Sequence, residues 1–164
     1  LEGIVDVWLP DFKYSDNGLA EALSQAPDYS KYALSSLKAM VHQTGTTLQT
    51  DDRGIARRGV IIRHLVLPGF VENSLGVLKL IAEHVSPNLH LSLMSQYYPT
   101  DYILAENQKS LIAKCKSLHR EITRSEYETV ADAFYALAFT RGWLQEYGSH
   151  KNYRPDFSKD HPFN

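Results

Sequence analysis

Two basic side chains, Lys13 and Arg63, are candidates for binding an anionic ligand. Lys13 lies two residues after Asp11, in the stretch that follows a predicted strand over residues 3–9. An arginine guanidinium can hold a carboxylate or a phosphate through two parallel hydrogen bonds, and a lysine adds a point charge. Asp11 can bind an amine or help to hold a cation. The alternative is that Asp11 and Lys13 are a solvated turn pair of little energetic value.

Arg63 interrupts the most apolar segment of the chain, residues 60–67. A buried arginine is costly unless it is paired, so its presence there favours a functional role. Alternate side chains of a strand face opposite sides of the sheet. Arg63 therefore shares a face with Ile61, Leu65 and Leu67, whereas His64 shares the other with Val60, Ile62 and Val66. We predict that Arg63 faces a ligand and that His64 is a hydrogen-bonded histidine beneath a helix.

Gln96 and Tyr97 follow a third predicted strand, residues 89–94. Ligands of parallel α/β sheets bind at the carboxyl ends of the strands, and neighbouring ends converge. The sequence therefore predicts that residues 10–14, Arg63 and residues 95–99 converge on one binding site. Asp11, Lys13, Arg63, Gln96 and Tyr97 are among its polar side chains.

The elements that must position these residues follow from apolar periodicity and from caps. Helices are predicted over residues 19–26, 30–44, 73–85 (with Asn73 or Ser74 as N-cap) and 124–141, the last opened by a Thr123–Glu126 capping box. A small hairpin is predicted within 46–56, and a long loop with short helical pieces over 100–122. Strands that alternate with helices predict an α/β fold: a mostly parallel open sheet, helices on its outside, and a C-terminal helix followed by an irregular tail.

Composition excludes several classes of protein. The chain has 164 residues, 43% of them hydrophobic, which fits one folded domain and excludes disorder. Its net charge of −2 gives no electrostatic footprint for nucleic acid, and no apolar run approaches the ~20 residues of a membrane span. The single cysteine, Cys115, cannot form an internal disulfide or hold a metal cluster alone. We therefore expect a cytoplasmic protein with no nucleic-acid or membrane partner and no metal site.

Common catalytic motifs are missing from the sequence. The seven histidines show no His-Glu-x-x-His spacing, and there is no P-loop, Gly-x-Gly-x-x-Gly or Gly-x-Ser-x-Gly segment. Cys115 has no recognisable base partner, so we interpret it as a structural thiol. A small hydrolase or transferase that uses Asp11, His64 and Lys13 is the weakest interpretation, because no nucleophile is evident.

Several segments together resemble one family, the radical S-adenosylmethionine (SAM) proteins that are similar to pyruvate formate-lyase activating enzyme. The resemblance extends over essentially the whole chain, and LPDFKY and RHLVLPG together are its most specific parts. The matching segments are VDVWLPDFKY (5–14), APDY (26–29), Met40 with Gln43, GIARRGV (54–60), RHLVLPG (63–69), QYYP (96–99), the Thr123–Glu126 box and YRPDF (153–157).

The resemblance implies a partial (β/α) barrel. In the family, a Cys-x-x-x-Cys-x-x-Cys loop holds a [4Fe–4S] cluster and a Gly-Gly-Glu-like strand binds the SAM amino group. Reductive cleavage of SAM then yields a 5′-deoxyadenosyl radical that abstracts hydrogen from a substrate. In the activating enzymes that substrate is a glycine of a partner protein. The resemblance therefore implies a glycyl-radical-type protein or a small molecule as the substrate here.

The resemblance also implies roles for the candidate residues. Asp11 and Lys13 match an Asp-x-Lys near the SAM methionyl carboxylate and an associated cation. Arg63 matches an arginine that faces the barrel lumen. Tyr97 stands roughly where the activating enzymes have a histidine, which leaves Gln96 an equal candidate.

The chain departs from the family because it has neither the three-cysteine motif nor the Gly-Gly-Glu strand. Starting at Leu1 with a predicted strand, it resembles the C-terminal part of the barrel: residues 1–146 form that portion and 147–164 a tail packed on it. We expect to find neither SAM nor the cluster bound to this chain alone, and we expect the chain to be inactive, with its missing N-terminal part as a partner. An exposed sheet edge predicts self-association. The alternative is a free-standing small α/β ligand-binding domain without catalysis.

Overall fold

The computed structural model describes residues 3–104 and 115–149. Its sheet contains four parallel strands that lie side by side in the order in which they occur along the chain. These are β1 (Val7–Trp8), β3 (Ala56–Leu65), β4 (His90–Met94) and β5 (Gly142–Leu144). A short strand, β2 (Gln49–Thr50), pairs with β3 in the antiparallel direction and forms the predicted hairpin.

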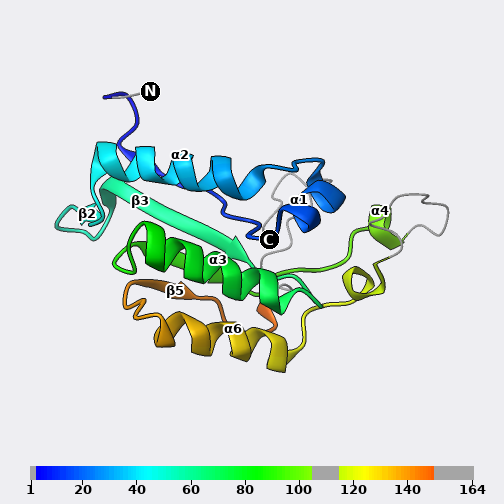
Figure 1. The fold of residues 1–164 in the computed structure, drawn as a ribbon. Helices are drawn as coiled ribbons and strands as arrows, with labels where there is room; N and C mark the ends of the chain where they lie inside the picture. The colour runs from blue at the N-terminus through cyan, green and yellow to red at the C-terminus, as the bar shows by residue number, and fades with distance from the viewer. Residues whose placement is uncertain (1–2, 105–114, 150–164) are drawn as a thin grey trace, which may run out of the picture.

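Three long helices form one layer over the sheet, with α3 in contact with both α2 and α6 (Figure 1). Parallel crossovers are right-handed as a rule, and the strand order here advances in a single direction. Successive helices therefore fall on the same face, as in barrels, whereas a doubly wound sheet reverses its order and carries helices on both faces. The helices within the described ranges are α1 (Asn17–Ser24), α2 (Tyr29–Thr44), α3 (Val71–His84), α4 (Asp101–Leu104) and α6 (Arg124–Ala136), with a 3₁₀ turn, η1 (Lys116–His119).

The core lies between the sheet and this helical layer. Alternate strand residues that face the helices are almost completely buried, and they pack against apolar side chains of α2, α3 and α6. They include Val60, Ile62, Leu91 and Leu93, which contribute to one cluster with Leu37, Ile81 and Phe134. The intervening residues Arg63, Ser92 and Met94 are exposed or half-buried, since no described element covers their face of the sheet. This open face is where the predicted site must lie.

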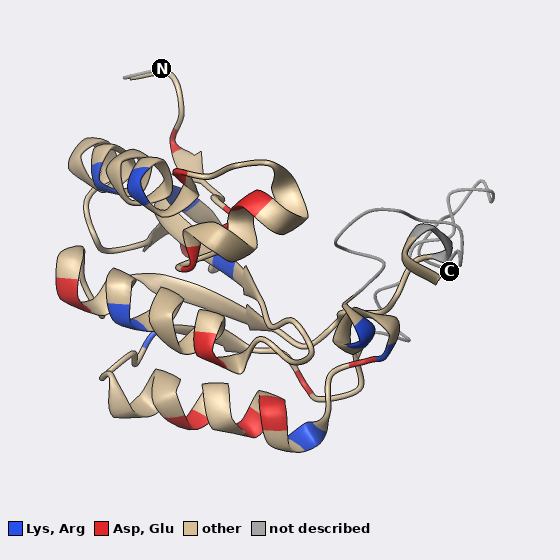
Figure 2. Ribbon diagram, turned by 45° about the vertical axis from the view of Figure 1, so that its right-hand side comes forward, with Lys and Arg blue, Asp and Glu red and all other residues tan. Residues whose placement is uncertain are grey.

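Most charged residues of the three long helices are exposed to solvent. Figure 2 shows mainly acidic positions on α6 and basic positions on α2. Such amphipathic helices bury one stripe and solvate the other. None of the helices in the described ranges is long and apolar enough to cross a bilayer.

The structure confirms the predicted α/β class with a mostly parallel sheet, and it corrects several element bounds. The first strand is confined to Val7–Trp8 instead of residues 3–9. Helix α3 begins at Val71, so neither Asn73 nor Ser74 is its N-cap. Residues 105–114 of the predicted loop and residues 150–164 of the predicted tail lie outside the described residues.

The largest correction concerns the segment predicted as a helix over 124–141. Helix α6 ends at Ala136, and Ala138 adopts a left-handed conformation with φ 61°. The turn brings Phe139 back onto the core, where its ring stacks on that of Phe134 with the ring centroids 5.1 Å apart. Burial of an aromatic side chain outweighs the helical propensity of this stretch. The chain then continues as β5, a strand that the sequence analysis missed.

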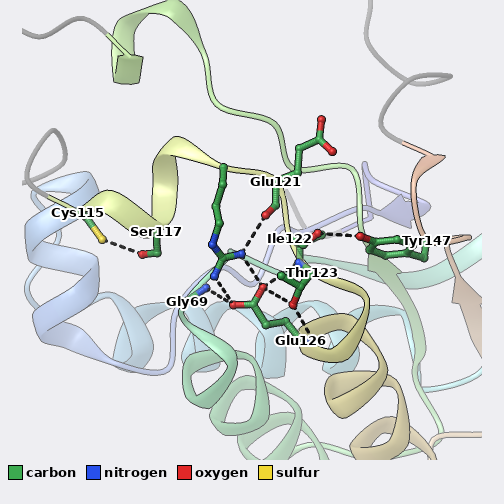
Figure 3. A network of polar contacts seen from close by, with 9 residues as sticks. Gly69, Cys115, Ser117, Glu121, Ile122, Thr123, Glu126 and Tyr147 are labelled. Atoms are coloured by element: carbon green, nitrogen blue, oxygen red, sulfur yellow. Dashed lines mark hydrogen bonds and ion pairs between the residues drawn. The ribbon is translucent and has the colours of Figure 1, made fainter.

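A polar network around Glu126 fixes the start of α6 (Figure 3). Both terminal nitrogens of Arg120 donate to the Glu126 carboxylate at 2.8 Å, and Thr123 completes the predicted capping box. The carboxylate also accepts the Gly69 N–H at 2.7 Å, which ties the β3–α3 loop to α6. These bonds, that of Arg120 foremost, hold the pKa of Glu126 well below its usual range.

Candidate functional site

The open face carries a groove made of two adjoining cavities of about 420 and 570 Å³. Arg63, Met94 and Gln96 line both cavities and form the boundary between them. The smaller cavity adds Asp11, Lys13, Tyr14, Leu65 and Leu67, and the larger adds Ser92, Trp143, Leu144, Gln145, Glu146 and Ser149. We call this feature the open-face groove. An apolar pocket of about 450 Å³ beside α2 contains only Asp11 of the predicted site residues.

Strand register explains why these residues meet. Asp11 forms an isolated parallel bridge with Arg63, which is level with Ser92 on β4, and Ser92 is level with Trp143 on β5. Adjacent strands lie about 4.8 Å apart, and residues in register share a face of the sheet. The four side chains therefore form a row across the open face.

Arg63 is held by Asp11. Its Nε–H donates to Asp11 Oδ1 at 2.7 Å, and the two side chains remain 45% and 38% exposed. Within the described residues, the terminal NH₂ groups of Arg63 have no hydrogen-bond partner. A guanidinium that is anchored through Nε keeps its terminal donors for a ligand, so Arg63 can bind a carboxylate or phosphate.

The loop that presents Asp11 and Lys13 is fixed through its backbone. The hydroxyl of Tyr29 donates to the Asp11 carbonyl and accepts the Lys13 N–H, both at 2.9 Å. Asn73 donates from Nδ2 to the Lys13 carbonyl at 3.0 Å and accepts the Ser15 N–H at 2.9 Å. This preorganisation lowers the entropy cost of placing the two charged side chains at a ligand.

His64 supports the same loop from the helical side of the sheet. It is completely buried, with Nδ1 2.7 Å from the Phe12 carbonyl oxygen and Nε2 2.8 Å from Ser74 Oγ. Because a carbonyl only accepts, Nδ1 carries the proton and Nε2 accepts the Ser74 hydroxyl. The prediction of a hydrogen-bonded histidine beneath a helix is confirmed. The hydrolase interpretation is wrong in its geometry, because His64 and Arg63 face opposite sides of β3 and His64 is absent from the groove.

The buried imidazole makes the stability of the protein depend on pH. Burial lowers the pKa of His64 from 6.5 to about 4. The unfolded chain therefore binds a proton on His64 between these pH values that the folded protein does not, so stability decreases as pH falls through this range. We expect a loss of about 3 kcal/mol between pH 7 and pH 4 from this group. Urea unfolding across this range, together with NMR titration of the His64 ring, measures it; a ring that titrates near 6.5 would contradict the assignment.

Gln96 lies at the centre of the groove, where Gln145 holds it. Gln145 Nε2 donates to Gln96 Oε1 at 2.8 Å, while Gln145 Oε1 accepts the Ser95 N–H at 2.8 Å. Tyr97 lies elsewhere. Its ring is buried, its hydroxyl donates to the Leu118 carbonyl at 2.7 Å, and burial raises its pKa to about 12. Of the five predicted site residues, the groove thus contains Asp11, Lys13, Arg63 and Gln96 but not Tyr97.

Sequence reasoning missed three residues that build the site. Gln145 directly follows β5, and the rule that strand ends carry functional residues would have identified it if that strand had been predicted. Tyr29 and Asn73 form hydrogen bonds with backbone atoms of residues that are 18 and 60 positions away in the sequence. Neither lies in a local pattern that indicates such a role.

The cysteine content of the chain does not fit an iron–sulfur cluster, which needs several cysteine thiolates. Cys115 is the sole cysteine in the sequence. Over 3–104 and 115–149, no group of three or more His, Cys, Asp or Glu side chains is placed to hold a metal ion. Comparison with protein-family models, curated proteins and solved structures finds no match to this chain.

Proposed function

We propose that this chain is the C-terminal part of a radical SAM iron–sulfur enzyme that is similar to pyruvate formate-lyase activating enzyme. The open-face groove is then the wall of a partial barrel and binds SAM through its methionyl carboxylate. The observation that carries the proposal is the pairing of Arg63 with Asp11 through Nε, which leaves the terminal guanidinium nitrogens without a partner among the described residues, in the cavity that Lys13 also lines. The resemblance of the segments around Asp11 and Arg63 to this family supports it as well.

Each groove residue has a defined part in this proposal. Lys13 and Arg63 bind the carboxylate, and Asp11 orients Arg63 and offers negative charge to the amino group. SAM and its cluster supply radical chemistry when they are bound, and this chain supplies binding and orientation. The cluster thiolates come from a part of the enzyme outside this chain, so the chain alone is inactive. The radical acts on a glycine of a partner protein or on a small molecule, in the cytoplasm.

The edge of the sheet at β1 supports a further partner for this chain. Within the described residues, β1 pairs with β3 alone, and Leu9 beyond it is 54% exposed. An unpaired strand edge is a template for another strand. We propose that the missing N-terminal part covers this edge, and that the isolated chain self-associates through it.

Titration of the isotope-labelled chain with SAM, followed by NMR, tests the proposed site. Without the cluster and the N-terminal part, the chain should not retain SAM on purification. At millimolar concentration SAM should still occupy the groove weakly, with a Kd on the order of 1 mM, and shift the side-chain signals of Arg63 and Gln96. Adenosine lacks the methionyl carboxylate and is the matched control, so it should leave the Arg63 signal unchanged. Equal shifts with both compounds, or none in the groove with SAM, would contradict the proposal and favour a ligand-binding domain without catalysis.

A further inference from the structure

The two amide side chains in the groove have orientations that follow from a single backbone group. The Ser95 N–H can only donate, so the atom of Gln145 that faces it at 2.8 Å must be the carbonyl oxygen. The other end of the Gln145 amide is then its NH₂ group, which can only donate. Its partner in Gln96, 2.8 Å away, must therefore be the Gln96 carbonyl oxygen.

Gln96 is left with its NH₂ group for a ligand. Among the described residues this group has no hydrogen-bond partner, and Gln96 lines both cavities of the open-face groove. Lys13 and the terminal nitrogens of Arg63 are also pure donors. The boundary between the two cavities thus presents donors from Gln96 and Arg63.

The backbone around Gln145 is held firmly enough for its side chain to fix the orientation of the Gln96 amide. Its backbone N–H donates to the Leu93 carbonyl at 2.9 Å, and its carbonyl accepts the buried Tyr127 hydroxyl at 2.6 Å. The neighbouring Ser95 hydroxyl donates to the Glu146 carbonyl at 2.8 Å. Strand β5 and its C-terminal extension are therefore fastened to β4 on both sides of the Gln145 side chain.

We infer that Gln145 is a positioning residue that fixes Gln96 as a hydrogen-bond donor, so that the groove selects a ligand with an acceptor oxygen at this point. The inference rests on the proposed site, and it names carboxylate or carbonyl oxygen as the group that Gln96 contacts. It does not require that the ligand be SAM.

Gln145→Glu tests the inference because it reverses the order of the amides. A carboxylate at this position still accepts the Ser95 N–H, but its second oxygen also accepts. Gln96 must then rotate, donate its NH₂ group to Glu and turn its own oxygen toward the groove. We expect acetate to bind about tenfold more weakly to the variant. Methylammonium, which should not bind the wild-type groove, should shift the Gln96 signals of the variant.

The added negative charge also repels acetate, so a double-mutant cycle separates the two effects. Gln145→Glu is also made in a Gln96→Met background, where only the effect of the added charge on acetate binding remains. Gln49→Glu, at an exposed position outside the groove, controls for net charge. A larger loss of acetate affinity with Gln96 present supports the inference. An equal loss in both backgrounds overturns it.

The wild-type chain provides a second measurement if the variant does not fold. The Gln145 NH₂ protons are hydrogen-bonded and should exchange with water more slowly than those of Gln96, and acetate should shift the Gln96 NH₂ signals. The reverse order of exchange rates would overturn the inference. Acetate binding to Gln96 without SAM binding would contradict the proposed cofactor and leave the role of Gln145 intact.

Discussion

Gly142→Ala should destabilise the protein by at least about 3 kcal/mol and detach β5 from the sheet. Gly142 has φ +125°, and a Cβ atom there would lie 2.0 Å from the carbonyl oxygen and 2.7 Å from the nitrogen of Leu91. Both are backbone atoms of β4, and Leu91 is the register partner of Gly142. Relief of the clash therefore requires the strands to separate. Urea unfolding of the variant measures the loss.

Gly148→Ala is the matched control for this substitution. Gly148 also has a positive φ, +85°, but a Cβ atom there meets no atom of the described residues within 4 Å. The control should cost about 1 kcal/mol from backbone strain alone. Similar losses in the two variants would contradict the proposed clash. Because Gln145 follows β5, Gly142→Ala should also weaken acetate binding in the groove, whereas Gly148→Ala should not.

Arg63→Met should lower the affinity of the groove for SAM by about 10-fold to 100-fold. The substitution keeps an unbranched apolar stem and removes the donors that face a carboxylate, and a charged hydrogen bond of this kind contributes about 1.5–3 kcal/mol. The half-exposed ion pair with Asp11 adds little to stability, so unfolding should change by less than about 1 kcal/mol. The NMR titration with SAM measures the affinity, and urea unfolding measures the stability.

Arg57→Met gives the comparison for Arg63→Met. Arg57 lies near the other end of β3 and pairs with Asp51 at 2.6 Å, with its side chain 58% exposed. Arg57→Met removes the same charge from the same strand, but outside the groove. It should therefore leave the SAM affinity within about twofold of wild type, a change in binding free energy below about 0.5 kcal/mol. Equal losses of SAM affinity in the two variants would show that net charge, and not the Arg63 guanidinium, determines binding.

The sequence was sufficient to predict much of the site because strand-end residues obey a simple geometric rule. Period-2 alternation placed Arg63 and His64 on opposite faces of β3, and the structure confirms both positions. The parallel order of the strands then brought Asp11, Lys13 and Gln96 to the same groove as Arg63. The first prediction depends on local backbone geometry, and the second on the parallel sheet that alternating strands and helices indicate.

What the sequence did not reveal depends on long-range packing. Strand β5 has only three residues, and the left-handed turn at Ala138 that precedes it is stabilised by the contact of Phe139 with Phe134. Tyr97 does not line the groove, and its buried hydroxyl donates to the Leu118 carbonyl, 21 residues away in the sequence. Such contacts override local propensity and leave no periodic signal.

The most direct test of the central claim is the sequence of the source reading frame upstream of the codon for Leu1. The radical SAM proposal predicts a Cys-x-x-x-Cys-x-x-Cys motif there, followed by a Gly-Gly-Glu-like strand, since the chain itself has a single cysteine. That result would make SAM binding by the full-length protein the next measurement. A start codon immediately before Leu1, with no upstream cysteines, would contradict the radical SAM proposal.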